Sequence, residues 1–99
     1  MAETKYQYSP RKQVISEFDE MKIDMDHMLC IPSVHAVFGQ SYVVIDFCGG
    51  VRDLQGDFPD EKIDLLKKWI ALHKDEIQKN HYRCEHSEFP LEPISPWNA

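Results

Sequence analysis

The 99 residues allow one domain with one core, and 42% apolar against 28% charged residues excludes wholesale disorder. Seventeen acidic against eleven basic residues give a net charge of -6, which argues against direct nucleic-acid binding, because neutralising phosphates requires a basic face. No apolar stretch approaches the roughly 20 residues of a membrane span, and residues 1–13 lack a signal-peptide core, so we expect a cytoplasmic protein without membrane association.

Residues 14–18 form one run with apolar residues at Val14, Ile15 and Phe18, and apolar and polar residues alternate from Met21 to Asp26, which is typical of a strand with one face in solvent. Asp19-Glu20 separates two runs there and is short enough for a hairpin turn. A β-branched and aromatic run over Val34–Phe47 is broken at Gly39-Gln40, which predicts two further strands joined by a turn. Val51–Leu54 is a candidate for one further, short strand. We therefore expect a small antiparallel sheet of three or four strands.

One long amphipathic helix is predicted from Pro59 to Tyr82, where the apolar residues adopt the helical period. Acidic residues at its start and lysines in its later turns complement the helix dipole. A broad apolar face packs onto a sheet, so the chain is expected to form an α+β domain with this helix on one face. The buried stripe is expected to comprise Ile63, Leu66, Ile70 and Ile77, widened by Leu65, Trp69 and Leu72.

The predicted domain covers residues 13–87, between a flexible polar lead-in at 1–12 and a Pro-rich extended tail at 88–99. Prolines recur at every third position of this tail, which disfavours a helix. Its apolar residues would pin it either to its own domain or to a partner. These residues are Phe89, Leu91, Ile94 and Trp97.

Short motifs spread over residues 14–97 also follow one another in a distinctive order. They are Ile15-Ser16-Glu17-Phe18, His35-Ala36-x-Phe38-Gly39, Val43-Val44-Ile45-Asp46, Phe58-Pro59, Trp69-x-x-Leu72-His73-x-Asp75-Glu76 and Pro90-Leu91-x-Pro93-Ile94-x-Pro96. In this combination the chain resembles a small bacterial family of unknown function. The family has a His-x-Pro-Pro-His-Phe-His-Ala signature and a Trp-x-x-Leu-His-x-Asp-Glu helix. Its genes often lie beside another small reading frame, so the resemblance implies a toxin–antitoxin component.

The chain departs from this family at the histidine cluster. In place of the signature it has Leu29-Cys30-Ile31-Pro32-Ser33-Val34-His35, which keeps the last histidine and one proline. Ser33 replaces the middle histidine, and Leu29 replaces the first unless His27 substitutes for it. Metal or acid–base chemistry would need two imidazoles at this cluster, so the departure argues against both.

Two groups of residues are candidates for chemistry. His35, Asp46 and His73 would be catalytic if the helix brought them together, and the reaction class would be metal-assisted phosphodiester hydrolysis, as in a nuclease. A lone histidine on an amphipathic face is more often structural, and we favour that interpretation. A metal trio is the second candidate, although its spacing matches no standard finger and no cofactor is expected. The trio is His81, Cys84 and His86.

No recognised catalytic motif is present, so an interaction module is the favoured function and an enzyme is the alternative. Asp24 and Asp26 share one strand face, and Phe89 and Trp97 supply apolar surface in the tail. We expect these four residues to bind a basic protein partner, and a homodimer is a further possibility. The resemblance adds a concrete version, an antitoxin-like or accessory component of a two-gene module.

Overall fold

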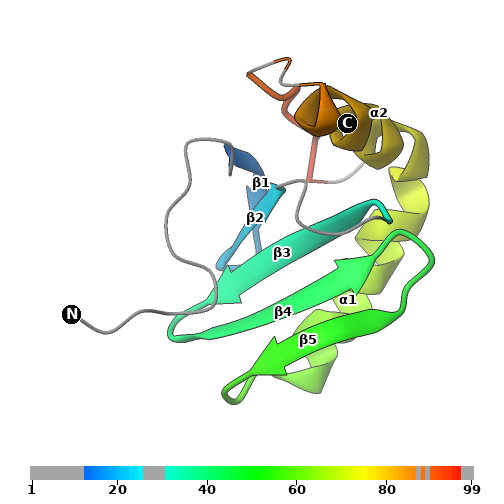
Figure 1. Ribbon diagram of the computed structural model, residues 1–99. Helices are drawn as coiled ribbons and strands as arrows, with labels where there is room; N and C mark the ends of the chain where they lie inside the picture. The colour runs from blue at the N-terminus through cyan, green and yellow to red at the C-terminus, as the bar shows by residue number, and fades with distance from the viewer. Residues whose placement is uncertain (1–12, 26–30, 87, 89, 97–99) are drawn as a thin grey trace.

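The computed structural model describes residues 13–25, 31–86, 88 and 90–96. These residues form an α+β fold in which each strand pairs antiparallel with the next along the chain, so the sheet order is β1-β2-β3-β4-β5 (Figure 1). The α+β class and the antiparallel sheet are as the sequence predicts. The elements are β1 (Gln13–Phe18), β2 (Met21–Met25), β3 (Ser33–Phe38), β4 (Ser41–Asp46), β5 (Val51–Gln55), α1 (Asp60–Leu72) and α2 (Lys74–Glu85).

Both predicted hairpin turns are confirmed. Asp19 and Glu20 connect β1 to β2 with φ values of 52° and 66°, the left-handed conformation that a type I′ turn needs at both of its central residues. Gly39 connects β3 to β4 with a φ of 61°, which glycine adopts without steric cost. The first hairpin therefore places two non-glycine residues in a conformation that usually favours glycine.

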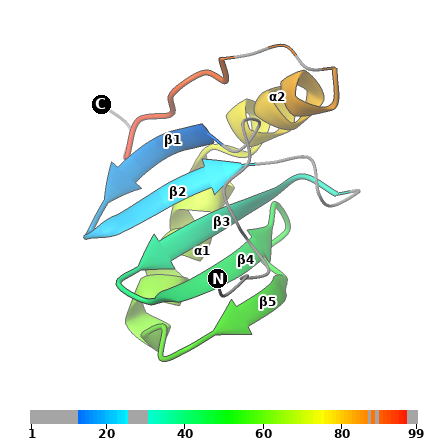
Figure 2. The same ribbon diagram turned by 60° about the vertical axis from the view of Figure 1, so that its left-hand side comes forward.

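The helices cover one face of the sheet (Figure 2), and the hydrophobic core is formed by residues of the strands, the helices and the tail. We call this covered face the inner face of the sheet and the opposite one the outer face. Alternate strand residues point inward, as the period-two pattern predicts. The core residues of the strands and helices are Ile15, Phe18, Met21, Ile23, Met25, Val34, Ala36, Val43, Ile45, Ile63, Leu66, Trp69, Ile70, Ile77 and Cys84.

Within the described residues the sheet has five strands, so the expected number of three or four was wrong. The weakest sequence signal belongs to β5, which is a sheet edge and has only two apolar residues, Val51 and Leu54, both exposed. An edge strand has neighbours on one side only and is under less demand for burial. Its sequence consequently lacks the strong alternation that marks β2 to β4.

The single long helix was also wrong, because His73 separates α1 from α2 with φ -119° and ψ 29°. No glycine or proline lies at this point, and the apolar spacing continues from Ile70 to Ile77 across the break. The break allows α2 to run in a different direction from α1 (Figure 1). Leu72, predicted to widen the buried stripe, is instead 55% exposed at the end of α1.

The described part of the tail packs on its own domain, which was one of the two alternatives. Leu91 and Ile94 are buried in the core, and the Ile94 N–H donates to the Ile15 carbonyl of β1 at 2.8 Å. Asn80 of α2 bonds both backbone groups of Glu92 at 2.9 Å. The Trp69 indole N–H donates to the Ser95 carbonyl at 3.0 Å. Within the residues described, neither helix is long and apolar enough to cross a membrane.

Candidate functional site

The first candidate, His35, lies on the outer face of the sheet and pairs with Asp24 on the neighbouring strand. The two residues are direct partners in the β2–β3 register, and His35 Nδ1–H donates to Asp24 Oδ1 at 2.9 Å. Asp24 is 7% exposed and His35 8% exposed. A polar pair at this depth satisfies hydrogen-bonding groups that would otherwise be costly to bury. Asp24 was expected to be a solvated docking residue, but it is buried and partnered.

Asp46, the second candidate, organises the turn between β4 and β5. Its Oδ1 accepts the backbone N–H groups of Cys48 and Gly50, both at 2.9 Å, and its Oδ2 lies 3.2 Å from Arg52 Nε. A Cβ on Gly50 would approach Asp46 Oδ2 to 2.8 Å, so glycine is needed for this close contact. The carboxylate is therefore engaged by the turn that it stabilises.

The third candidate, His73, belongs to the helix layer, where its Nδ1–H donates to Glu76 and its ring lies 5.3 Å from that of Trp69. His35 and Asp46 alternate with core residues of their strands and so lie on the outer face. The sheet consequently separates His73 from the other two, and the predicted catalytic trio is not assembled. Each side chain has a local structural partner instead.

The proposed metal trio is not assembled either. Cys84 is fully buried in the core, His81 Nε2 lies 3.4 Å from Glu85, and His86 stacks on Tyr82 with ring centroids 4.0 Å apart. Among the residues that the structure describes, no group of three His, Cys, Asp or Glu side chains gathers as a metal site would require. The remaining predicted binding residues, Asp26, Phe89 and Trp97, lie outside the described residues.

Four of the five residues of the edge strand β5 are exposed. This strand pairs with β4 on one side, and no described strand pairs with its other side (Figure 2). Its partners in the register are the core residues Val43 and Ile45, which places Leu54 and Val51 on the inner face. Nevertheless, Val51 is 44% and Leu54 45% exposed. We call Val51, Leu54 and the strand edge between them the β5 ledge.

An acidic segment follows the β5 ledge directly along the chain. Four carboxylates lie in the loop after β5 and the first turns of α1, and all four are exposed. Two of them, Asp60 and Glu61, occupy the first turn of α1, where the positive end of the helix dipole favours them. The whole segment consists of Asp57, Asp60, Glu61 and Asp64. An extended chain that pairs with β5 would therefore end beside concentrated negative charge.

On the other side of β5, Tyr42 of β4 donates its hydroxyl to Asp53 Oδ2 at 3.2 Å. Partial burial, followed by the charge and the hydrogen bond of Asp53, raises the pKa of Tyr42 above its ordinary value. The Leu54 N–H donates to Asp53 Oδ1 at 2.9 Å. The Tyr42–Asp53 hydrogen bond therefore joins β5 to β4 on the outer face, while the apolar side chains of β5 stay exposed.

Neither a protein-family model, nor a curated protein, nor a solved structure matches this chain. The family resemblance carried by the short motifs stays a prediction. The sequence analysis missed the β5 ledge, and the signal that marks it is modest: two apolar residues separated by an arginine and an aspartate, followed at once by an acidic run.

Proposed function

We propose that this protein is a protein-binding module whose β5 ledge receives an extended segment of a basic partner. The observation that carries the proposal is a sheet edge with which no described strand pairs, and on which two inner-face apolar residues are exposed. A peptide that adds to such an edge gains affinity from main-chain hydrogen bonds, and it gains specificity from its alternate side chains. Val51 and Leu54 would contact the inward-pointing side chains of the added segment.

The charge of the surface supports a basic partner rather than a second copy of this chain. Asp57, Asp60, Glu61 and Asp64 follow the ledge along the chain and are exposed, and the whole chain carries a net charge of -6. Two such chains repel each other, whereas lysines or arginines on a partner would be attracted and would associate faster. The resemblance to a toxin–antitoxin family gives this proposal a specific form, in which the partner is a small basic protein encoded beside this one.

The test compares two pairs of exposed apolar residues. Val51→Ser with Leu54→Ser removes the apolar part of the ledge. Val14→Ser with Leu72→Ser is the matched control, because those side chains are 56% and 55% exposed elsewhere on the surface. A photo-cross-linker placed at Gln55 on β5 identifies the partner in cells, and one placed at Glu17 on β1 is its control.

We expect the Gln55 cross-linker to capture an extended basic segment. A synthetic peptide of that segment should slow hydrogen exchange of the β5 amides, and its association rate should fall as salt rises. Loss of binding should be confined to the ledge variant. Equal cross-linking from Glu17, or equal weakening in the control variant, contradicts the proposal. Capture of a second copy of this chain at Gln55 would replace the basic partner with a homodimer.

A further inference from the structure

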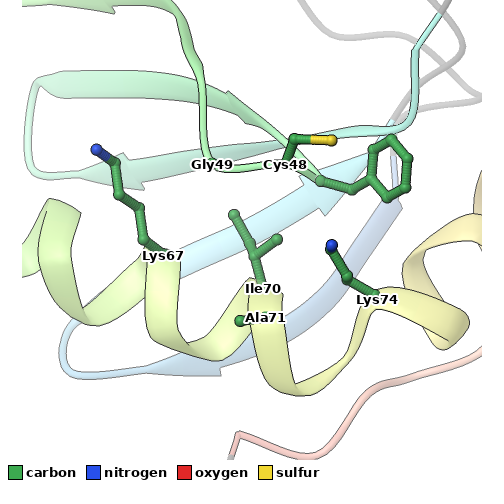
Figure 3. Close-up of a pocket in the computed structure, with 7 residues that line it drawn as sticks. Cys48, Gly49, Lys67, Ile70, Ala71 and Lys74 are labelled. Atoms are coloured by element: carbon green, nitrogen blue, oxygen red, sulfur yellow. The ribbon is translucent and has the colours of Figure 1, made fainter.

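A hollow of about 380 Å³ opens between the β4–β5 turn and the C-terminal half of α1 (Figure 3). This volume lies within the range of small-molecule sites, roughly 300–1,000 Å³. The turn contributes three lining residues and the helix contributes most of the rest. The lining residues are Phe47, Cys48, Gly49, Lys67, Ile70, Ala71 and Lys74.

The hollow combines an apolar centre with a positive charge at each end. Ile70 and Ala71 lie in the middle, with Lys67 on one side of them and Lys74 on the other (Figure 3). Lys67 belongs to α1 and Lys74 is the first residue of α2, beyond the break at His73, so the two ammonium groups come from different helices. Lys74 Nζ lies 5.6 Å from the centre of the Phe47 ring, which draws this ammonium group over the rim of the hollow.

None of the seven lining residues is acidic, although the chain as a whole is. Asp46, the carboxylate that holds the adjoining turn, is engaged by the turn amides and by Arg52. The lining therefore presents two ammonium groups, an apolar floor and the Cys48 thiol. Such a lining suits a ligand with a hydrocarbon body and negative charge, since each part of the ligand finds a complementary surface.

We propose that this hollow binds a small organic dianion, an aliphatic body with a carboxylate at each end. Its carboxylates bind Lys67 and Lys74, and its body lies over Ile70 and Ala71. The site is separate from the β5 ledge and uses none of its residues. The ligand proposal can therefore be tested independently of the proposed function.

Cys48 supplies a direct readout of occupancy, because it is exposed and lines the hollow, whereas Cys84 is buried in the core. A neutral alkylating agent is added, and mass spectrometry of the resulting peptides measures the rate at Cys48. Suberate, an eight-carbon dicarboxylate, is the probe. At about ten times its Kd, a ligand that covers the thiol slows alkylation about tenfold. Octane-1,8-diamine and sodium sulfate at the same ionic strength are the controls, and neither should slow it.

Substitutions test whether suberate protects Cys48 by binding in the hollow. Lys67→Ala with Lys74→Ala should abolish it, whereas Lys22→Ala with Lys68→Ala removes the same charge from exposed positions outside the hollow and should leave it intact. Ala71→Leu keeps both lysines but fills part of the space, and should weaken protection as well. The proposal is overturned if suberate gives no saturable protection, if sulfate protects equally, or if the two double variants behave alike.

Discussion

The two edges of the sheet differ in whether another segment of the chain covers them. At β1, the tail returns along the edge, with a main-chain hydrogen bond from Ile94 to Ile15 and the Ile94 side chain 3% exposed. At β5, no described segment covers the edge, and Val51 and Leu54 remain in solvent. Open edges invite pairing with other chains, so proteins usually cover or interrupt them. The covered edge contributes to the fold of this domain, and the other edge is the one to which we propose that a partner adds.

The two edges of the sheet also differ in charge. The contacts at the covered edge are mainly neutral: buried apolar side chains, the Asn80 amide and the Trp69 indole. The open edge leads into exposed carboxylates at the start of α1. Neutral buried contacts stabilise a fold regardless of salt, whereas exposed charges add little stability and act mainly on association. We therefore propose that the covered edge serves stability and the β5 edge serves binding, and single substitutions can test this difference.

The largest expected difference is between Ile94→Ala at the covered edge and Leu54→Ala at the open one. Ile94 is buried, so its truncation should lower the free energy of unfolding by about 2–5 kcal/mol. Leu54 is 45% exposed, and its truncation should cost less than about 0.5 kcal/mol. Urea unfolding of both variants measures the difference. Equal losses would show that the tail does not contribute to the core.

Asn80→Ala should give the next largest effect, a loss of about 1–3 kcal/mol, because a buried amide loses its hydrogen bonds to the tail. Its side chain bonds both the N–H and the carbonyl of Glu92 at 2.9 Å. Gln78→Ala, at an exposed position two residues earlier, is the control. Hydrogen exchange at the Glu92 amide should accelerate in the Asn80 variant alone. Unchanged exchange there would mean that the tail is held by other contacts.

The β1–β2 turn should become more stable when glycine replaces Glu20, by about 1 kcal/mol, since a φ of 66° strains a side chain. Gln40 occupies the equivalent position of the β3–β4 turn but has no positive φ. Gln40→Gly should therefore bring no gain and should cost a few tenths to about 1 kcal/mol. Thermal unfolding of the two variants gives the sign of each effect. Increased stability of both glycine variants would contradict backbone strain at Glu20.

The smallest expected effect is on the pH dependence of stability, through the pKa of Tyr42 on β4. Its pKa is raised in the folded state, so its contribution to stability is present below the ordinary tyrosine pKa of about 10 and is lost as pH rises through the folded value. Asp53→Asn should lower this pKa and reduce the alkaline loss of stability, whereas Asp57→Asn should leave both unchanged. NMR titration of the Tyr42 ring measures the shift. An unaltered pKa in the Asp53 variant would refute this assignment.

The elements that local patterns predicted well are those that local physics controls. The two hairpin turns follow from short polar links between alternating runs, and the buried residues Ile63, Leu66, Ile70 and Ile77 follow from the helical period. The break at His73 could not be predicted in this way, because the period continues across it and no glycine or proline marks it. It depends on where α2 packs.

The surroundings of the candidate site residues depend still more on tertiary structure. Asp24 and His35 were each identified as candidates, yet their pairing depends on the β2–β3 register, which the residues between the two strands do not reveal. His73 was grouped with His35, but the intervening sheet separates them. Whether a polar residue on a strand is solvated or buried is decided by what lies across from it, and alternation alone leaves that undetermined.

Composition and periodicity were thus sufficient for an acidic α+β domain with an antiparallel sheet, because turns and amphipathic faces are properties of neighbouring residues. Only the folded chain decided which edge the tail covers, since Ile94 meets Ile15 across most of the sequence. The same holds for the exposure of Val51 and Leu54 and for the hollow between Lys67 and Lys74. Contacts between distant segments have no local signal, and in this protein they form the surfaces available for binding.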